Sequence, residues 1–283
     1  MRISDFELYR DLLYRHSGLS LTADKSYLLD SRLTPVARRW GYPTLDGMTL
    51  SLRGVPENKL VEAIIEAMIN DETCFFRDIE CFFVLRDAVI PFLMKTRGKN
   101  KKLRIWCAGC SSGQEAYSVA MILKDMELQL KNWKIEILGS DLSGQAIRKA
   151  RAGDYTQFEV QRGLPVQRLM QHFDEVGDFW RLHDDIRNLV RFEQFNLLEP
   201  MDDLGLFDLI LCRNVMASFE SETRTSILSR MAGQMAEDGI LLLGSGETLN
   251  GIKTPFKPLD SRPGFFGLEK ADYALTAPKQ AAC

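Results

Sequence analysis

Short apolar runs alternate with amphipathic segments from about residue 103 onward. The apolar runs are LRIWC, IEILGSDLS, LVRFEQF, FDLILC and GILLLGS, and helical patterns such as EAYSVAMILKDM and GQAIRKARAG lie between them. Strands that are apolar along their whole length belong to sheets buried on both faces, and intervening helices allow neighbouring strands to be parallel. This alternation therefore predicts an α/β fold with helices on both faces of a parallel sheet.

The first seventy residues have a different pattern, with apolar residues at helical spacing and without strand signals. One helix is expected near the N-terminus, a second from about Lys25 and a third over about residues 56–69. Proline lacks a backbone donor, so Thr34-Pro35 is expected to kink the second helix or to restart it with Thr34 as its cap. The pattern predicts a small all-helical domain.

Three segments follow from these patterns. We expect a helical domain over residues 1–70, a linker over 71–80 and a sheet-containing domain over 81–283. Within the last segment, the charged stretch at about 153–191 carries strand signals around 179–183, which predicts a small insertion subdomain.

The composition is typical of a globular protein of the cytoplasm. Hydrophobic residues make up 45% and charged residues 27%, and no apolar run approaches the roughly 20 residues that a membrane helix needs. The first ten residues, MRISDFELYR, are charged and amphipathic, unlike a signal peptide. A net charge of −3 provides no overall attraction to nucleic acid. We expect a cytoplasmic monomer without membrane insertion and without a nucleic-acid partner.

The sequence WCAGC at residues 106–110 is similar to the dithiol of thioredoxin-like proteins. In such a dithiol the first cysteine lies at the start of a helix, because the helix terminus lowers the pKa of the thiol. Here Cys107 closes a strand, and the helix begins near Gly113, after both cysteines. Cys107 and Cys110 also lack a second cysteine pair that would complete a zinc site. Thiol redox chemistry and a structural metal are therefore not expected.

The loop around WCAGC fits a nucleotide pocket better. Gly109 and Gly113 allow backbone amides to approach a ligand at the start of the next helix. Asp141 ends the following strand, where an acid accepts hydrogen bonds from the two hydroxyls of a ribose, whereas Ser143 is better placed to cap the next helix. These features favour an adenosine-containing ligand, either a nicotinamide dinucleotide or S-adenosylmethionine. The glycines miss the G-x-G-x-x-G spacing of dinucleotide folds, which favours S-adenosylmethionine.

Five sequence motifs, spread over nearly the whole chain, carry a resemblance to a known family. They are NDETCFFRD at residues 70–78, WCAGCSSGQEAYSVAM, GSDLS, FNLLEP and FDLILCRNV. With them the sequence resembles the chemotaxis receptor methyltransferases, the CheR-type protein-glutamate O-methyltransferases. The resemblance implies a class I S-adenosylmethionine-dependent methyltransferase, in which a Rossmann-like sheet is joined to a helical N-terminal domain and carries a small β-subdomain. It also implies methyl transfer from S-adenosyl-L-methionine to glutamate side chains on the cytoplasmic helices of chemoreceptors, with S-adenosyl-L-homocysteine as the product.

The resemblance further implies the residues of the site. Carried over motif by motif, the cofactor contacts are Asp71, Thr73, Arg77, Glu115, Asp141 for the ribose, Asn196 and Leu197 near the adenine, Arg213 and Asn214. Arg77 is also the side chain expected to matter most for catalysis, because an arginine fork orients a carboxylate at two points. Ser218 stands where the family has a tyrosine that positions the substrate.

Methyl transfer to glutamate needs little acid–base catalysis. A glutamate carboxylate, with an ordinary pKa of about 4.3, is already ionised at neutral pH. Its attack on a sulfonium methyl group joins opposite charges into neutral products, so a dry, well-oriented site helps more than a catalytic acid. The expected contribution of the protein is therefore orientation.

Three departures from the family pattern bear on this function. Asp71 replaces the usual asparagine, which makes the cofactor pocket more anionic. Ser218 replaces the tyrosine, and a serine hydroxyl does not reach as far. The segment FDEVGDFWRL at residues 173–182 is shorter than in members that bind a C-terminal receptor pentapeptide, and it lacks their Gly-x-Gly turn. We therefore expect an enzyme that is independent of the pentapeptide.

Basic residues in the helical domain offer a way to recognise a receptor. They are Lys25, Arg32, Arg38, Arg39 and Arg53, and they form either a face that steers glutamate-rich receptor helices or a merely solvated surface. A non-catalytic module that senses S-adenosylmethionine remains an alternative function, because Asp71 and Ser218 depart from the family. A nucleic-acid methyltransferase is disfavoured, since CRNV stands where an adenine-N6 enzyme has its Asp/Asn-Pro-Pro-aromatic motif.

Overall fold

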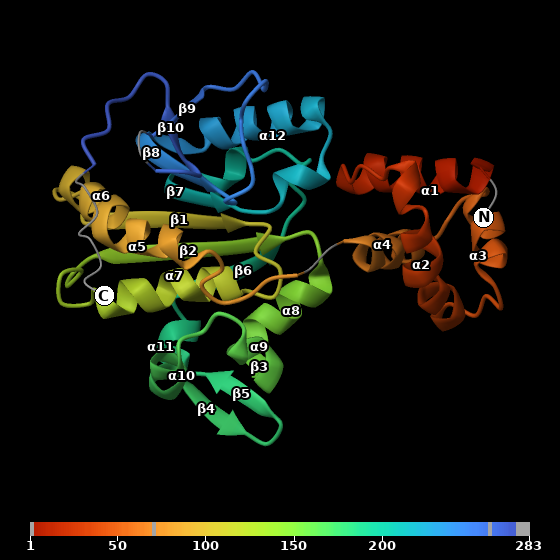
Figure 1. Cartoon of the computed structure of the whole chain (residues 1–283), viewed down its shortest axis with the longest axis horizontal. Coiled ribbons are helices and arrows are strands. Elements are labelled where there is room, and N and C mark those ends of the chain that lie inside the picture. Colours follow the sequence, from red (N-terminus) through yellow and green to blue (C-terminus); the bar gives the residue numbers. More distant parts are fainter. Residues whose placement is uncertain (1–2, 70–71, 260–261, 276–283) are drawn as a thin grey trace. The chain divides into compact units, whose positions relative to one another are not determined.

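The computed structural model describes residues 3–69, 72–259 and 262–275, so Asp71 lies outside the described residues. The chain divides into two compact units (Figure 1). The first is made of residues 1–70 and 217–223, and the second of residues 71–216 and 224–283. Among the described residues, no helix is both long and apolar enough to cross a bilayer.

Helices build the first unit around a small apolar core. They are α1 (Ile3–Ser17), η1 (Ala23–Lys25), α2 (Tyr27–Arg39), α3 (Leu45–Leu52) and α4 (Asn58–Met68). Leu13, Leu33 and Ile64 are fully buried, and the buried Tyr9 hydroxyl lies 2.8 Å from that of Thr49. The helical spacing of apolar residues therefore reflects a real core, as predicted.

Two features of this unit differ from the sequence prediction. Helix α2 runs through Pro35 to Arg39, so the predicted restart at Thr34 is wrong. The Thr34 hydroxyl donates to the carbonyl oxygen of Asp30 one turn earlier at 2.6 Å, inside the helix, and buried Leu33 and Val36 on either side of Pro35 offset the lost backbone bond. Helix α3 was not predicted; its N-cap residue Thr44 accepts a hydrogen bond from Gly47 N at 3.2 Å.

Two of the five basic residues in this unit are used for internal contacts. Arg32 Nη1 donates to the carbonyl oxygens of Met68 and Ile69 at 2.9 and 3.1 Å, at the C-terminal end of α4. Arg53 pairs with the buried Asp5 at 2.7 Å. The predicted basic face is thereby reduced to Lys25, Arg38 and Arg39, all of which are exposed.

Residues 217–223 belong to the first unit although they lie far along the chain. Helix α1 ends at Ser17 and is followed by Gly18, which has a φ of +72°, and Leu19 then forms an antiparallel bridge with Phe219. Ser20 N donates to the Ser218 carbonyl oxygen at 2.9 Å, and buried Phe219 completes the contact. Main-chain pairing therefore fixes this short segment.

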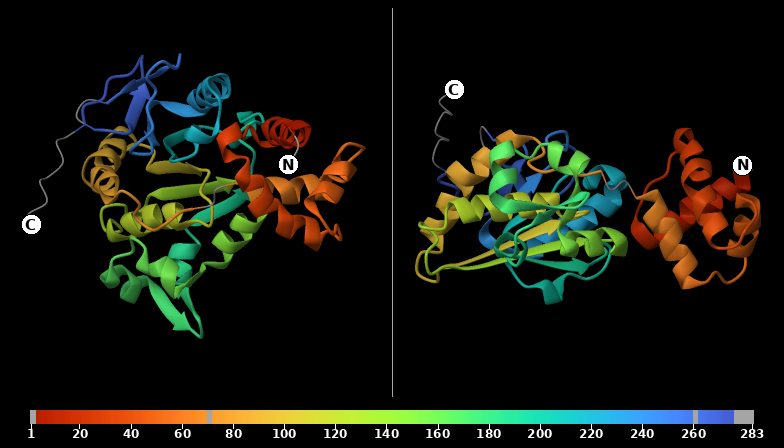
Figure 2. Two further views of the ribbon diagram at one scale, coloured as in Figure 1. Left: turned by 45° about the vertical axis from the view of Figure 1, so that its right-hand side comes forward. Right: turned by 90° about the horizontal axis from the view of Figure 1, so that it is seen from below.

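The second unit is built on a seven-stranded sheet. Its strands are β1 (Lys102–Ala108), β2 (Lys134–Asp141), β6 (Val190–Gln194), β7 (Phe207–Cys212), β8 (Met235–Leu243), β9 (Phe256–Pro258) and β10 (Phe265–Leu268). The order is β6-β2-β1-β7-β8-β10-β9; the first five are parallel, whereas β10 is antiparallel to β8 and β9. Figure 2 shows these strands side by side through the middle of the unit with helices around them. The predicted α/β fold class is confirmed.

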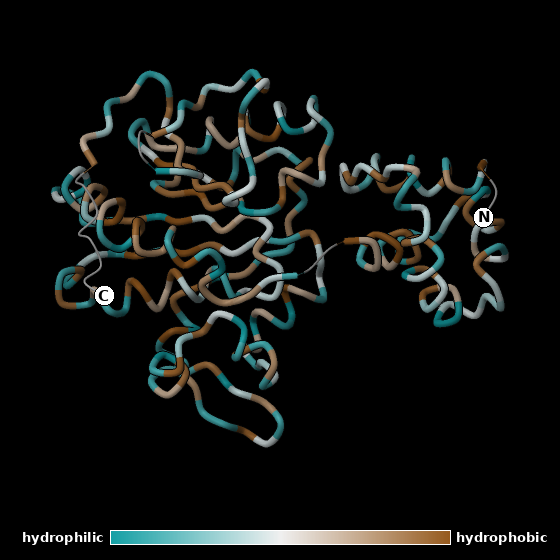
Figure 3. The backbone as a smooth tube through the Cα atoms, in the orientation of Figure 1, coloured by the Kyte–Doolittle hydropathy of each residue, from teal (hydrophilic) through white to brown (hydrophobic). Residues whose placement is uncertain are grey.

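Helices separate the strands of this sheet. They are α5 (Ile79–Val84), a π-helical turn η2 (Leu85–Val89), α6 (Ile90–Thr96), α7 (Gln114–Asp125), α8 (Gly144–Ala152), η3 (Asp202–Leu204), η4 (Met216–Ser218) and α12 (Ser221–Gly233). Ile105 and Cys107 of β1 face the core that α5, α6 and α7 share. Trp106 points to the other face of the sheet, where its ring stacks on that of Phe207 with the ring centroids 5.4 Å apart. Hydrophobic residues concentrate along the central strands (Figure 3).

A small antiparallel sheet forms the insertion. Its strands β3 (Asp154–Thr156), β4 (Phe173–Val176) and β5 (Phe179–Leu182) have the order β3-β5-β4, and the helices α9 (Gln157–Gln161), α10 (Val166–His172) and α11 (Asp184–Arg187) accompany them. Gly177 and Asp178 alone join β4 to β5, with Gly177 at a φ of +60°. The hairpin seen at the bottom of Figure 1 is therefore short and tightly turned.

Candidate active site

The carboxyl ends of the five parallel strands lie along one side of the central sheet, which we call the carboxyl edge. Strand β1 is followed along the chain by β2 on one side, whereas β7 lies on its other side, so the order of the sheet reverses between β1 and β7. Ligands of open α/β sheets bind outside the carboxyl ends at such a reversal. Six of the predicted residues come from this edge, either at a strand end, in the loop that follows a strand or in the first turn of the next helix: Glu115, Asp141, Asn196, Leu197, Arg213 and Asn214.

The glycine loop after β1 is packed tightly against its neighbours. Gly109 N and Cys110 N both donate to the Ser140 carbonyl oxygen, at 2.8 and 2.9 Å. Gly109 has a φ of +72°, and a Cβ atom there would lie 2.4 Å from a methyl carbon of Val215. Both backbone conformation and space therefore require glycine here, whereas the predicted approach of the Gly109 amide to a ligand stays a prediction.

Asp141 is fixed by backbone amides at the end of β2. Its carboxylate accepts hydrogen bonds from Ser111 N at 2.7 Å and from Ser143 N at 2.9 Å. Burial raises the pKa of Asp141 above its ordinary value, although these amide donors act in the opposite direction. The Ser143 side chain accepts from Ala146 N, which confirms Ser143 as the cap of α8. Backbone amides therefore fix the Asp141 carboxylate, and the side-chain cap of α8 is Ser143.

A buried guanidinium joins three segments of this edge. The Arg213 side chain is 2% exposed, and its Nη1 donates to Glu115 Oε2 at 3.1 Å. Its Nη2 donates to Asp78 Oδ2 at 2.8 Å and to the Arg77 carbonyl oxygen at 2.7 Å. Arg213 Nε has no hydrogen-bond partner in the described part of the chain. Arg213 therefore connects the linker, the start of α7 and the end of β7.

Both positively and negatively charged side chains lie near Glu115. Burial raises the pKa of Glu115 above its ordinary value, and the nearby carboxylate of Glu247 raises it further. Arg213 and, more weakly, Arg77 act in the opposite direction. A buried acid in this setting favours an added cation, because a cation restores the charged form of the carboxylate.

The linker segment after residue 71 is held in an unusual backbone conformation. Phe76 and Asp78 have φ values of +49° and +54°, which bulky or branched residues rarely adopt. Phe75 is fully buried, with its ring 5.0 Å from that of Tyr155, and Phe76 N donates to Ser118 Oγ at 3.0 Å. Such strain concentrates at functional sites, since only extensive packing maintains it.

The remaining linker residues lie within this anchored stretch. Thr73 is half-buried in the extended chain that leads to Phe75. Arg77 is half-buried, and its Nη1 donates to the Glu72 carbonyl oxygen at 3.2 Å. The structure thus places Arg77 directly beside the buried Arg213, through the bond to its carbonyl oxygen.

The loop after β6 is held by an arginine that the sequence analysis missed. Asn196 Oδ1 accepts a hydrogen bond from Leu198 N at 3.0 Å, and Leu197 is buried. Arg230 of α12 donates to the carbonyl oxygens of Leu197, Leu198 and Glu199 at 2.9, 2.7 and 2.6 Å. A lone arginine in a helix pattern gives no sequence signal for this role.

The candidates after β7 divide between the two units. Asn214 has a φ of +60°, and its N–H donates to Glu247 Oε2 at 2.8 Å. Ser218 belongs to the first unit, where its carbonyl oxygen pairs with Ser20 N. Asp78 and Glu247 are further residues that the sequence analysis missed, although Asp78 lies inside the quoted NDETCFFRD motif.

The two cysteines of WCAGC do not have the features of a reactive dithiol. Cys107 and Cys110 are buried free thiols, and burial raises the pKa of each well above its ordinary value. A reactive dithiol needs a lowered pKa. In the described ranges, no group of three or more His, Cys, Asp or Glu side chains is arranged to hold a metal ion.

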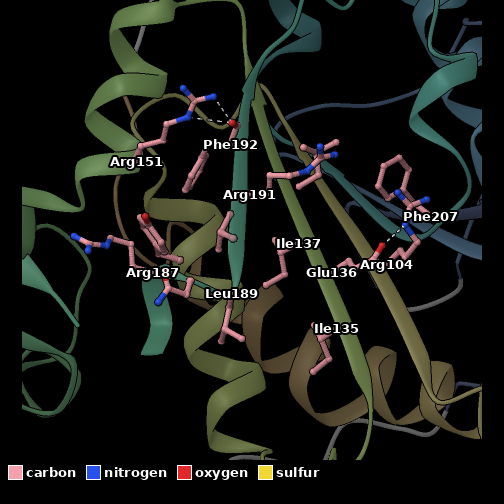
Figure 4. Close-up of a pocket in the computed structure, with 14 residues that line it drawn as sticks. Arg104, Ile135, Glu136, Ile137, Arg151, Arg187, Leu189, Arg191, Phe192 and Phe207 are labelled. Carbon is pink, nitrogen blue, oxygen red and sulfur yellow. Dashed lines mark hydrogen bonds and ion pairs between the residues drawn. The ribbon is translucent and has the colours of Figure 1, made fainter. Parts of the chain in front are cut away.

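A cavity of about 640 Å³ lies at the β6 edge of the sheet, and none of the candidate site residues lines it (Figure 4). Arginine side chains line much of this cavity, but two of them form hydrogen bonds with other groups of the protein. Arg151 donates to the Phe192 carbonyl oxygen at 2.6 Å, and Arg104 donates to Glu136 at 2.9 Å. This cavity is therefore separate from the carboxyl edge.

Comparison with known proteins gives consistent matches along the chain. The CheR methyltransferase all-alpha domain matches residues 4–69, and the CheR methyltransferase SAM binding domain matches residues 71–265. The chain is 37% identical over 266 residues to chemotaxis protein methyltransferase 1 of Pseudomonas aeruginosa, covering 92% of this chain and 96% of that protein. It is 36% identical to chemotaxis protein methyltransferase Cher2 of Pseudomonas putida, with the same coverage, and 33% identical to a chemotaxis protein methyltransferase of Vibrio parahaemolyticus, covering 93% and 96%. The chain therefore belongs to the CheR methyltransferase family of S-adenosyl-L-methionine-dependent enzymes, as its motifs indicated.

Proposed function

We propose that this enzyme transfers the methyl group of S-adenosyl-L-methionine to glutamate side chains on the cytoplasmic helices of chemoreceptors. The products are glutamyl methyl esters and S-adenosyl-L-homocysteine. The observation that carries the proposal is the hydrogen-bonded network of Arg213, Glu115 and Asp78 at the carboxyl edge. Near-complete matches to relatives named chemotaxis protein methyltransferase support it.

The residues at the carboxyl edge fit the cofactor. The Asp141 carboxylate has two oxygens with room for about four hydrogen bonds, so backbone amides leave capacity for a ribose hydroxyl. The buried acid Glu115 suits a cationic ligand. Asn196 and Leu197 are proposed for the adenine, and Thr73, Asp71, Arg213 and Asn214 for the remaining contacts. When bound, the cofactor supplies a methyl group on a positively charged sulfur.

The substrate carboxylate is proposed to be oriented by Arg77. Arg77 is half-buried as a residue, and its Nη1 donates to the Glu72 carbonyl oxygen. An ionised glutamate needs no base, so the chain acts by holding the carboxylate and by excluding water. Ser218 is proposed to stand beside the substrate in place of the family tyrosine, which leaves orientation more dependent on Arg77.

Pentapeptide-independent action is proposed from the insertion subdomain. Strands β4 and β5 have four residues each, and a two-residue turn joins them, so the hairpin offers little length for an added strand. We expect calorimetry to detect no tight binding of an aromatic, acidic receptor-tail pentapeptide. Tight binding of that peptide would contradict this part of the proposal.

The setting proposed for this function is the cytoplasm, where a monomer meets the helical cytoplasmic domain of a receptor and no nucleic acid takes part. The helical domain over residues 1–70 and the linker over 71–80 are proposed to serve the catalytic domain over 81–283. Exposed Arg38 and Arg39 in the helical domain are proposed to meet the receptor.

Incubation with labelled S-adenosyl-L-methionine and receptor-containing membranes of the source organism tests the proposed function. We expect base-labile label on receptor glutamates, located by mass mapping of the peptides. A parallel calorimetric titration establishes whether the cofactor binds. Bound cofactor without label on any receptor would overturn the proposal and favour the non-catalytic sensing module.

A further inference from the structure

The turn after β8 contacts both neighbouring loops of the carboxyl edge. Residues 244–247 form this turn, closed by a hydrogen bond from Glu247 N to the Gly244 carbonyl oxygen at 2.9 Å. The Glu247 side chain folds back over the turn, and its Oε2 accepts from Gly244 N at 2.8 Å. The same oxygen accepts from Asn214 N at 2.8 Å. One carboxylate oxygen therefore joins the ends of β7 and β8.

The bond to Asn214 N supports a backbone conformation that is otherwise unfavourable. Asn214 has a φ of +60°, in the left-handed region that residues other than glycine rarely adopt, although asparagine does so more readily than most. A carboxylate that accepts a backbone N–H forms a charge-assisted bond, which is stronger than a neutral one. Gly244 allows the close approach, because a Cβ atom there would lie 2.8 Å from Asn214 Nδ2.

The same turn also reaches the linker. Ser245 Oγ donates to Asp78 Oδ2 at 3.1 Å, and that oxygen also accepts from Arg213 Nη2 at 2.8 Å. The turn thus touches Asn214 through Glu247, and it touches the Arg213 network through Ser245 and Asp78. Both routes end on residues proposed to hold the cofactor.

We infer that Glu247 is a positioning residue of this methyltransferase. It fixes the direction of the chain at Asn214 and thereby the aim of Asn214 and of its neighbour Arg213, without contacting the reacting groups. The inference rests on the proposed cofactor site, but it does not depend on which substrate receives the methyl group.

Calorimetric titration with S-adenosyl-L-methionine alone, without receptor, tests the inference. We expect Glu247→Ala to weaken binding about tenfold, the scale of one lost hydrogen bond to a charged group. Glu247→Gln keeps an oxygen that accepts a backbone N–H, so it is expected to bind within about threefold of the wild type. Glu269→Ala removes an exposed carboxylate after β10 and serves as the matched control, with unchanged affinity.

Backbone hydrogen exchange at Asn214 provides a second measurement that does not require ligand. We expect faster exchange of the Asn214 amide in Glu247→Ala than in the wild type, and nearly normal exchange in Glu247→Gln. Unchanged affinity and exchange in Glu247→Ala would overturn the inference. Equal losses in the Gln and Ala variants would also overturn it, because a hydrogen-bonding role predicts rescue. Failure of receptor methylation with normal cofactor binding would instead count against the proposed function alone.

Discussion

Single residues at the carboxyl edge combine strain with dense hydrogen bonding. Phe76, Asp78 and Asn214 all have positive φ values, and all lie in the linker or directly after β7. Each is held by a neighbour, since Phe76 N donates to Ser118, Asn214 N donates to Glu247, and the Asp78 carboxylate accepts from Arg213. Such backbone conformations persist only where the surroundings fix them.

Arg77→Ala is expected to reduce receptor methylation about a hundredfold or more while the fold survives. The lost two-point contact to a carboxylate is worth about 3 kcal/mol in the transition state. The fold is expected to survive because Arg77 contacts Arg213 through its main-chain oxygen, which the substitution keeps. The rate is measured with labelled cofactor, and thermal unfolding serves as the control. Wild-type turnover in this variant would remove Arg77 from the mechanism.

At the scale of elements, ion pairs connect the secondary structures of the second unit. The Arg97 side chain after α6 is 17% exposed and reaches two strands of the sheet. Its Nε donates to Asp208 of β7 at 2.6 Å, and its Nη1 donates to Asp238 of β8 at 2.9 Å. Arg97 keeps the pKa of Asp238 below its ordinary value, although burial alone would raise it. Ion pairs at the end of α6 therefore attach this helix to the sheet in addition to apolar packing.

Arg97→Ala is expected to lower the free energy of unfolding by about 3 kcal/mol, because it leaves two partly buried carboxylates without their cation. Urea unfolding at neutral pH measures the change. Arg86→Ala is the matched control, since Arg86 is 41% exposed and pairs with adjacent Asp87. The control is expected to lose less than about 1 kcal/mol. Equal losses in both variants would contradict a special role for Arg97.

The pairing of β1 with β2 predicts a pH dependence. Lys134 and Arg104, with Lys102, hold the pKa of Glu136 at about 2, below its ordinary 4.5, although partial burial acts in the opposite direction. The folded state therefore favours the ionised form, so this stabilisation is complete above pH 4.5 and disappears as the pH falls toward 2. Because Glu136 is 36% exposed, solvent screening limits the effect to about 1 kcal/mol.

Comparing the wild type with Glu136→Gln measures this contribution. We expect the wild type to unfold at higher urea concentration at pH 7, and the difference between the two proteins to shrink steadily as the pH falls from 4.5 toward 2. A difference that stays constant over this pH range would show that packing, and not charge, distinguishes them.

At the scale of the whole molecule, we expect exposed positive charges on the helical unit to attract the proposed receptor. Arg38 and Arg39 lie in the last turn of α2 and are exposed, whereas Arg32 and Arg53 are occupied within the unit. The structure thus reduces the five basic residues considered for receptor recognition to the exposed Lys25, Arg38 and Arg39. Interactions of such exposed charges act on association and weaken with added salt.

Reversal of charge at Arg38 and Arg39 to glutamate is expected to raise the KM for receptor about tenfold at low salt, with kcat and cofactor affinity unchanged. The physical reason is repulsion from glutamate-rich receptor helices. Methylation assays at two salt concentrations measure the effect, which should shrink at 0.5 M salt because screening is then stronger. Unchanged KM at low salt would identify these arginines as a solvated surface only.

Patterns along the chain predicted most of the elements of this protein, although not helix α3, and the local parts of its candidate site. Apolar runs and helical spacing predicted the sheet and the N-terminal helices, because these patterns reflect burial of one element at a time. Gly109 and Asp141 were predictable for the same reason, since a tight turn and a strand end are local features. The proposed restart at Thr34 failed because packing of Leu33 and Val36 outweighs the local effect of one proline.

The contacts between distant residues became apparent only in the folded chain. Arg213 joins Glu115 and Asp78 although 98 and 135 residues separate it from them, and no spacing rule connects such positions. The roles of Arg230 and Glu247 were invisible for the same reason, because each bonds to main-chain groups that any sequence provides. Residues 217–223 likewise join the helical unit through backbone pairing. Side-chain patterns thus specify elements, whereas the contacts between remote backbone and buried charges form only when the chain has folded.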